Sequence, residues 1–291
     1  MDKTAVQKKR SRENGFFYNF LRRPLAMFGL TILLLEIILI FLLPVTLELD
    51  PYYMDTSNVN NAPSSEYILG TDTLGRDCLA RLCEGGKTSI IVGTVAVSIS
   101  IAIGVPLGMI AGYYRGAAEM IIMRLADIFM SLPTMILVLV LVAVFNPSLA
   151  VIIVVIGIVG WTGVGKLVYA ATLSVRNKEF IDAAKAIGTS DFVILCKEVL
   201  PNVMTPIWMT LAFRISAAIL TESSLSFLGA GVQPPQPSWG NIIAAAEQFV
   251  VLATRPWQWI PAGVCLFITV VAFNLIGEGI RDVMDPRTRK R

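Results

Sequence analysis

Few residues of this chain have the type and spacing that catalysis requires. The 291 residues include no histidine, so the commonest general base and metal ligand is missing. The run Gly86-Lys87-Thr88 resembles the end of a phosphate-binding loop, but the position that requires a glycine, five residues before Gly86, holds Arg81. No acidic pair, Ser–Lys pair or His–Glu pair is placed for hydrolysis inside a membrane. The sequence predicts a chain that is not an enzyme and holds no catalytic residue, metal or cofactor of its own.

Ionisable residues inside apolar sequence are the remaining candidates for chemistry. Arg214 and Glu222 lie eight residues apart in one apolar block, which predicts that they share a helical face. Such groups usually face the interior of a bundle or an aqueous pathway. Three interpretations are open: structural pairing, which is our primary interpretation, lining of a transport pathway, and a proton relay. The same alternatives hold for Glu36 in the first apolar block.

The composition indicates that lipid surrounds most of the chain. Hydrophobic residues make up 55% and charged residues 15%, and the mean hydropathy is +0.69. Soluble domains carry charge at roughly a quarter of their positions. The basic face interleaved with aromatic residues that typifies nucleic-acid binding is missing. We therefore expect an all-α polytopic membrane protein that does not bind nucleic acid.

The apolar blocks predict about six transmembrane helices, since each span needs about 20 mainly apolar residues. An uncleaved first span is favoured over a signal peptide, because no small-x-small cleavage site follows it. The predicted order is a tail over 1–24, a first helix over 25–43, an outer loop over 44–87, a core of five helices over 88–281 and a tail over 282–291. Within the core, spans are expected near 88–114, 128–145, 149–166, 205–227 and 259–280.

Lysine and arginine predict the orientation, because basic loops stay on the cytoplasmic side of a membrane. Seven basic residues precede the first span and five follow residue 280. In total, eighteen fall on the predicted inner side, against four in the outer loops 44–87 and 228–259. Both termini and the 173–204 loop are therefore expected in the cytoplasm.

The 173–204 loop has the pattern of two helices joined by a tight turn. Gly188 suits the end of the first helix, where a residue in the left-handed conformation closes the last turn. Thr189 or Ser190 can cap the second helix, and Pro201 is expected to end it.

The first of these two helices presents a small apolar face formed by Ala183, Ala184 and Ile187. One interpretation is an amphipathic connector lying on the membrane surface. The other is a helix whose small residues allow it to enter a partner's groove. The residue pattern alone leaves both open.

The pattern Asp182-Ala183-Ala184-x-x-x-Gly188, followed by Leu200-Pro201, resembles the EAA motif of permeases of ATP-driven (ABC) importers. In that family the loop forms coupling helices that sit in a cleft of the cytoplasmic ATPase. Asp182 stands where glutamate is more usual, and it keeps the charge on a shorter side chain.

The outer loop carries a second resemblance. Leu69–Asp77 is similar to the LGTDxLGRD signature of the "C" permease in dipeptide, oligopeptide and nickel importers, at Gly70, Asp72, Gly75, Arg76 and Asp77. Further runs of that branch follow in order at 112–114, 127–133, 222–229, 234–240 and 274–287.

The residue types in this loop also allow an interpretation that does not depend on the resemblance. Glycines permit tight turns, and Asp72, Arg76 and Asp77 could form a cluster of ion pairs. Such a cluster could rigidify the outer mouth or contact a substrate-delivery protein. Rigidification is our primary interpretation, because surface ion pairs alone define partners poorly.

The resemblance implies a type I ABC importer permease fold in the inner or plasma membrane of a prokaryote. It also implies a heterodimer with a homologous permease, two ATPase subunits that bind ATP and Mg²⁺, and an extracytoplasmic substrate-binding protein. Peptides are the expected substrate. Nickel, metal chelates and glutathione are alternatives within the same architecture, and a proton-coupled carrier is a more distant one.

Overall fold

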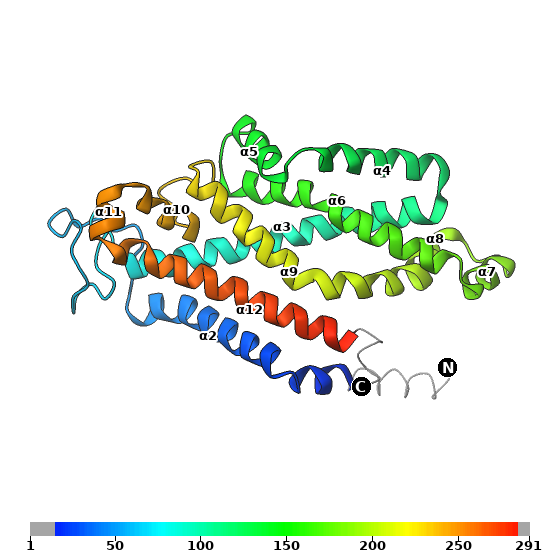
Figure 1. Cartoon of the computed structure of the whole chain (residues 1–291), viewed down its shortest axis with the longest axis horizontal. Coiled ribbons are helices and arrows are strands. Elements are labelled where there is room, and N and C mark those ends of the chain that lie inside the picture. Colours follow the sequence, from blue (N-terminus) through cyan, green and yellow to red (C-terminus); the bar gives the residue numbers. More distant parts are fainter. Residues whose placement is uncertain (1–14, 285–291) are drawn as a thin grey trace.

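The structure, a computed structural model, describes residues 15–284 as an elongated bundle of helices (Figure 1). No strand occurs in this part of the chain, only an isolated bridge between Thr71 and Asp77. Much of the two predicted tails falls on 1–14 and 285–291, outside the described residues. The α-helices are α2 (Pro24–Thr46), α3 (Cys78–Tyr114), α4 (Gly116–Ser131), α5 (Thr134–Val144), α6 (Leu149–Arg176), α7 (Glu179–Ala186), α8 (Asp191–Ile194), α9 (Leu200–Phe227), α10 (Trp239–Ile243), α11 (Phe249–Thr254) and α12 (Ile260–Met284).

Five helical stretches among the described residues are long and apolar enough to cross a membrane: α2, α3, α6, the continuous stretch Asp191–Phe227, and α12. A sixth span results if α4 and α5, which are bent by 92° relative to each other, are counted as one. The all-helical, polytopic architecture expected from the apolar blocks is confirmed.

The most extensive packing in the bundle is between α3 and α6. Gly104 and Gly108 of α3 face α6, and a Cβ added to them would lie 2.7 Å from Val164 Cβ and 2.8 Å from Val168 Cβ. Small residues at every fourth position let two membrane helices approach closely, because van der Waals contact takes the place of the hydrophobic driving force that lipid cannot supply. This pair forms the centre of the bundle.

The predicted span over 128–145 is interrupted by a bend in the structure. The chain bends at Leu132, which is extended (ψ 144°) because the following residue is Pro133. The α4 helix begins much earlier, at Gly116, and is joined to α6 by an ion pair between Lys166 Nζ and Asp127 Oδ1 at 2.7 Å. The predicted range therefore covers the last residues of α4 and the whole of α5.

Pro201 does not end a helix, contrary to the sequence expectation. A π-helical segment over Leu195–Val199 joins α8 to α9, and Pro201 lies in the first turn of α9. The π-helical turn shifts the hydrogen-bond register, which accommodates a residue that lacks an N–H group. The stretch from Asp191 to Phe227 is therefore helical throughout.

The two ends of the bundle differ in character. At one end lies the segment 47–77, which we call the outer loop, together with α10 and α11 (Figure 1). The opposite end carries α7 and α8, and α2 begins and α12 ends towards that side. The predicted outer loop was longer, 44–87, because α3 was expected to begin ten residues later than Cys78.

Candidate functional site

The turn after α7 is built by glycine. Gly188 has φ +78°, its N–H donates to the carbonyl of Lys185 at 2.9 Å, and the N–H of Thr189 donates to the carbonyl of Ala184 at 3.0 Å. These two hydrogen bonds form a Schellman motif, in which a left-handed residue satisfies the last carbonyls of a helix. The motif fixes the angle at which α8 leaves α7.

The α7–α8 unit (residues 179–194) exposes apolar side chains. Ile187 is 84% exposed and Phe192 74%, and both Asp182 and Ala183 are exposed. A Cβ added to Gly188 would meet no atom within 4 Å, so its open side leaves room for another molecule. Ala184 is half-buried against the core, so only part of the predicted face is free.

The inner side of the same unit is fixed to the bundle. Ile181 and Ile194 are fully buried in one cluster with residues of α3, α6 and α9. The hydroxyl of Tyr113, near the end of α3, donates to Asp191 Oδ1 at 2.7 Å. Leu200 is half-buried against the same cluster. Sequence reasoning missed these anchors, although the spacing of Ile181 and Ala184 on one helical face was a signal.

A second constellation lies in the outer loop, where Gly70 (φ +67°) and Gly75 (φ +73°) adopt conformations that favour glycine. Between them, Asp72 Oδ1 accepts hydrogen bonds from the N–H groups of Leu74 and Arg76, at 2.8 and 3.0 Å. Its Oδ2 accepts from Arg76 Nε at 2.7 Å. The carboxylate therefore holds its own turn together.

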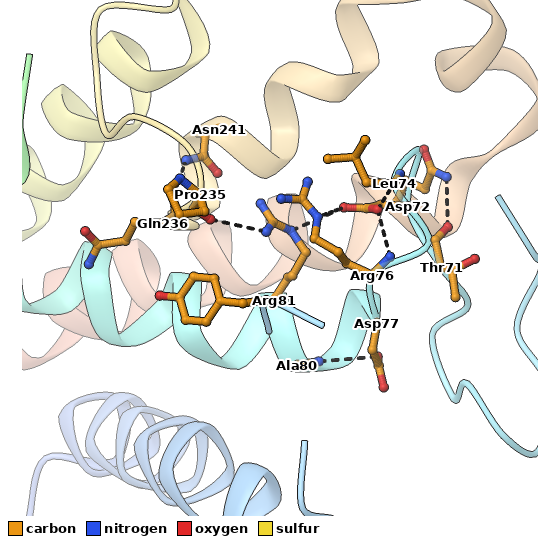
Figure 2. A network of polar contacts seen from close by, with 12 residues as sticks. Thr71, Asp72, Leu74, Arg76, Asp77, Ala80, Arg81, Pro235, Gln236 and Asn241 are labelled. Carbon is orange, nitrogen blue, oxygen red and sulfur yellow. Dashed lines mark hydrogen bonds and ion pairs between the residues drawn. The ribbon is translucent and has the colours of Figure 1, made fainter. Parts of the chain in front are cut away.

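Arg81 on α3 connects this turn to a distant segment, as Figure 2 shows. Its Nε lies 3.4 Å from Asp72 Oδ2, and its Nη1 donates to the carbonyl of Pro235 at 3.5 Å. Asp72, Arg76 and Arg81 form what we call the Asp72 clamp. Asp77 is not part of it, contrary to the predicted cluster, because it caps α3 by accepting from the N–H of Leu79 at 2.7 Å.

Two further aspartates of the loop, Asp55 and Asp77, are engaged elsewhere. Hydrogen bonds from Ser57 and Asn58 lower the pKa of Asp55 to about 2. Burial raises the pKa of Asp77, although the N–H groups at the start of α3 oppose this change. Neither carboxylate forms an ion pair with Arg76 or Arg81.

Glu222 occupies a closed cage of hydroxyl groups among α3, α9 and α10. It is fully buried, and its carboxylate accepts from Ser89 Oγ at 2.9 Å and Ser226 Oγ at 2.7 Å. Ser89 Oγ in turn accepts from the N–H of Trp239 at 3.2 Å. Glu222 thereby joins three elements, which is a structural arrangement.

Arg214 lies on the same helix as Glu222, α9, but its surroundings differ from those of Glu222. It is half-buried, and its only hydrogen bond among the described residues is a long one, 3.4 Å from Nε to Thr210 Oγ1. The missing side chain of Gly163 leaves room beside the guanidinium. Arg214 lines a cavity of about 160 Å³ whose other walls come from α3, α5 and α6 and include no acidic residue.

Glu36 is buried between α2 and α12. Its Oε2 accepts a hydrogen bond from Thr269 Oγ1 at 2.7 Å, and its Oε1 has no partner among the described residues. Thr269 also donates towards the carbonyl of Cys265 in its own helix. Glu36 is therefore a contact between two helices rather than part of either constellation described above.

Comparison with protein families matches most of the chain. Residues 104–290 match a family described as binding-protein-dependent transport system inner membrane component. Residues 14–63 match the N-terminal transmembrane domain of oligopeptide transport permease C. The two matches together include the α7–α8 unit, Arg214 and Glu222, but the Asp72 clamp lies between them.

Curated relatives are similar over nearly their whole length. The glutathione transport system permease protein GsiD of Pectobacterium atrosepticum is 37% identical over 94% of this chain and 91% of its own. A putative peptide permease protein of Brucella suis is 37% identical over 92% of this chain and 89% of its own. GsiD of Escherichia coli is also 37% identical, over 94% and 90%.

Solved structures share the fold. A chain of the MetNI methionine ABC transporter in inward-facing conformations superimposes with a TM-score of 0.58 at 19% identity, over 70% of this chain and 96% of that one. A chain of an amino acid ABC transporter gives a TM-score of 0.51 at 12% identity, over 69% and 92%. At such low identity these likenesses bear on architecture alone.

Proposed function

Because the chain belongs to the family of binding-protein-dependent transport system inner membrane components, we propose that it is one permease subunit of an ATP-driven peptide importer. A second, homologous permease would complete the pathway, and two cytoplasmic ATPase subunits would bind ATP and Mg²⁺. The observation that carries the proposal is the α7–α8 unit, which is anchored on one side and apolar and exposed on the other.

The orientation follows from charge. The excess of lysine and arginine in the tails and in the 173–204 loop favours a cytoplasmic location for both termini and for α7. In the structure, α2 begins and α12 ends towards the α7 end of the bundle (Figure 1). The outer loop and α10–α11 would then face the opposite, extracytoplasmic side.

Transmission of force requires a rigid connection between the ATPase and the spans. Movement of the α7–α8 unit would pass to α3 through Tyr113 and to α9 through the continuous helix that begins at Asp191. ATP can drive transport only if it stabilises one arrangement of the spans over another. The closely packed α3–α6 pair would move as one body during this change.

Peptides are the proposed substrate class, and the relatives named for glutathione and peptide transport support a substrate that carries carboxylate groups. Arg214 suits such a substrate, because it is a cation in a cavity that no acidic residue lines. We extend the proposal to this cavity as part of the pathway. A bare nickel ion is less favoured, because the cavity offers no acidic or sulfur ligand.

The experiment is uptake by the complete transporter, purified with its partners and reconstituted in vesicles. Transport should require ATP on the side of the membrane that α7 faces. An uncoupler should leave the rate of uptake unchanged at constant ATP. Uptake abolished by the uncoupler would indicate a proton-coupled carrier instead. Uptake by this chain alone would also contradict the proposal.

A further inference from the structure

A cavity of about 230 Å³ lies beside the Asp72 clamp, between the start of α3, the segment that holds α10 and α11, and the start of α12. Figure 2 shows its charged wall, where the side chains of Arg76 and Arg81 meet Asp72 and the loop around Pro235. Polar residues that line the cavity are Asp72, Thr73, Arg76, Arg81, Asn241, Gln248 and Gln258.

The charge in this cavity is unbalanced. Two guanidinium groups, each on a side chain that is 11% exposed, share the single carboxylate of Asp72. Arg76 uses its Nε, and Arg81 its Nε and Nη1; the remaining N–H groups of both form no hydrogen bond with another described residue. A buried charge without a partner is costly, so one positive charge here is left to be neutralised.

No other described acidic residue lines this cavity. Asp77, the second aspartate of the same motif, caps α3. Asp55 accepts hydrogen bonds from Ser57 and Asn58. The missing negative charge must therefore come from another molecule, or the cavity keeps an excess cation.

We propose that the cavity receives a carboxylate side chain of the extracytoplasmic substrate-binding protein when that protein docks on the outer loop. Guanidinium groups bind carboxylates through paired, charge-assisted hydrogen bonds, and two of them are already held in place by the Asp72 clamp. The inference rests on the proposed function, which places this end of the molecule outside the cell.

The lining of the cavity suits a single carboxylate side chain. Asp72, Arg76 and Arg81 form its charged wall. Apolar residues that include Ile242, Val251 and Trp257 line the remainder. The location of the cavity at the opposite end of the bundle from α7 also fits docking from outside (Figure 1).

The test places a competing carboxylate in the cavity. Gln248 lines it, is exposed, and forms no side-chain hydrogen bond with another described residue, so Gln248→Glu adds a charge without removing a contact. Gln248→Leu is the matched control, because it removes the amide without adding charge. Arg81→Gln gives the cavity the same net charge by removing one cation. It leaves the Asp72–Arg76 ion pair intact.

The measurement is the affinity of purified, substrate-free binding protein for the complete transporter in lipid nanodiscs. We expect Gln248→Glu and Arg81→Gln each to weaken binding by roughly tenfold, with Gln248→Leu close to the original affinity. Added salt should weaken binding to the original transporter more than binding to Gln248→Glu. Original affinity in Gln248→Glu, with the same dependence on salt, would overturn the inference even if Arg81→Gln could not be purified.

Two controls separate this inference from the function on which it rests. If binding protein fails to stimulate ATP hydrolysis by the unaltered transporter, the proposed function itself fails. If stimulation is normal and Gln248→Glu slows only the uptake of acidic substrates, without changing the affinity for substrate-free binding protein, the cavity serves the substrate and the docking inference is wrong.

Discussion

At the scale of single residues, Gly188 connects backbone conformation to the proposed docking. Its φ of +78° is readily adopted by glycine and tolerated by asparagine, and its open side faces away from the rest of the chain. A side chain at this position would therefore contact a partner rather than the protein itself.

We expect Gly188→Val to separate ATP hydrolysis from transport without preventing membrane insertion. Valine combines a strained backbone, which costs about 1–2 kcal/mol, with bulk at the surface where the ATPase would bind. Gly188→Asn is the matched control. Asparagine tolerates the left-handed conformation, so this variant adds a side chain at the surface without the backbone strain. Uptake per ATP hydrolysed is the measurement; an unchanged ratio in Gly188→Val at equal expression contradicts a docking role.

Glu222 makes a different prediction, because its hydroxyl cage is closed. Glu222→Gln should keep most of the hydrogen bonds and retain uptake. Glu222→Leu should leave the buried O–H donors of Ser89 and Ser226 without the carboxylate that accepts from them, at a cost of about 1–3 kcal/mol for each group, and lower the melting temperature in detergent. Loss of uptake in a well-folded Glu222→Gln variant would instead support a proton relay.

Arg214 should select for the substrate's carboxylate. With the binding protein saturated, peptides with a free C-terminal carboxylate should be transported faster than their amides, and Arg214→Gln should reduce this preference by roughly tenfold or more. Arg214→Lys should retain part of it. Equal preference in Arg214→Gln and the original protein would remove the cavity that Arg214 lines from the proposed pathway.

The residue types indicated some of these roles but not others. Gly188 was predictable, because a glycine after an alanine-rich helix has one common use. The separate roles of Asp72 and Asp77 were not, since both lie in the same turn-rich motif. Which one caps a helix depends on where α3 begins, and the charged residues of its first turns hid that start.

At the scale of elements, prolines show why the sequence alone could not give every boundary. Pro133 produces a bend of 92° between α4 and α5, whereas Pro201 lies in the first turn of a helix that continues a preceding one. Both residues lack an N–H group, but the π-helical register before Pro201 accommodates this loss. Nothing in the residues around Pro201 signals that register.

The α7–α8 unit should depend on its buried anchor for rigidity and on its exposed face for binding. Ile181→Ala removes a fully buried side chain, at a cost of about 2–5 kcal/mol, and should speed hydrogen exchange in α7 and α8. Ile187→Ala, at a position that is 84% exposed, should leave exchange unchanged but weaken association with the ATPase. Equal exchange in both variants would contradict the assignment of the anchor.

At the scale of the whole molecule, the two ends of the bundle serve different proposed partners. The outer loop holds a charged clamp and a cavity with an excess cation, while the opposite end presents an anchored apolar unit (Figure 1). The overall helical architecture was predictable from the apolar blocks, because lipid restricts spans to a few structures. The close α3–α6 pairing depends on the spacing of glycines, and mean hydropathy gives no information on that spacing.

Crosslinking from position 187 tests the central claim most directly. A photoreactive residue in place of Ile187 should form an adduct with a cytoplasmic ATPase subunit, and one in place of Leu74, in the outer loop, should not. The adduct should also form in inside-out vesicles that contain only membrane-bound and cytoplasmic proteins. An adduct from position 187 to an extracytoplasmic protein, or none to an ATPase in a transporter that is active, would contradict the account.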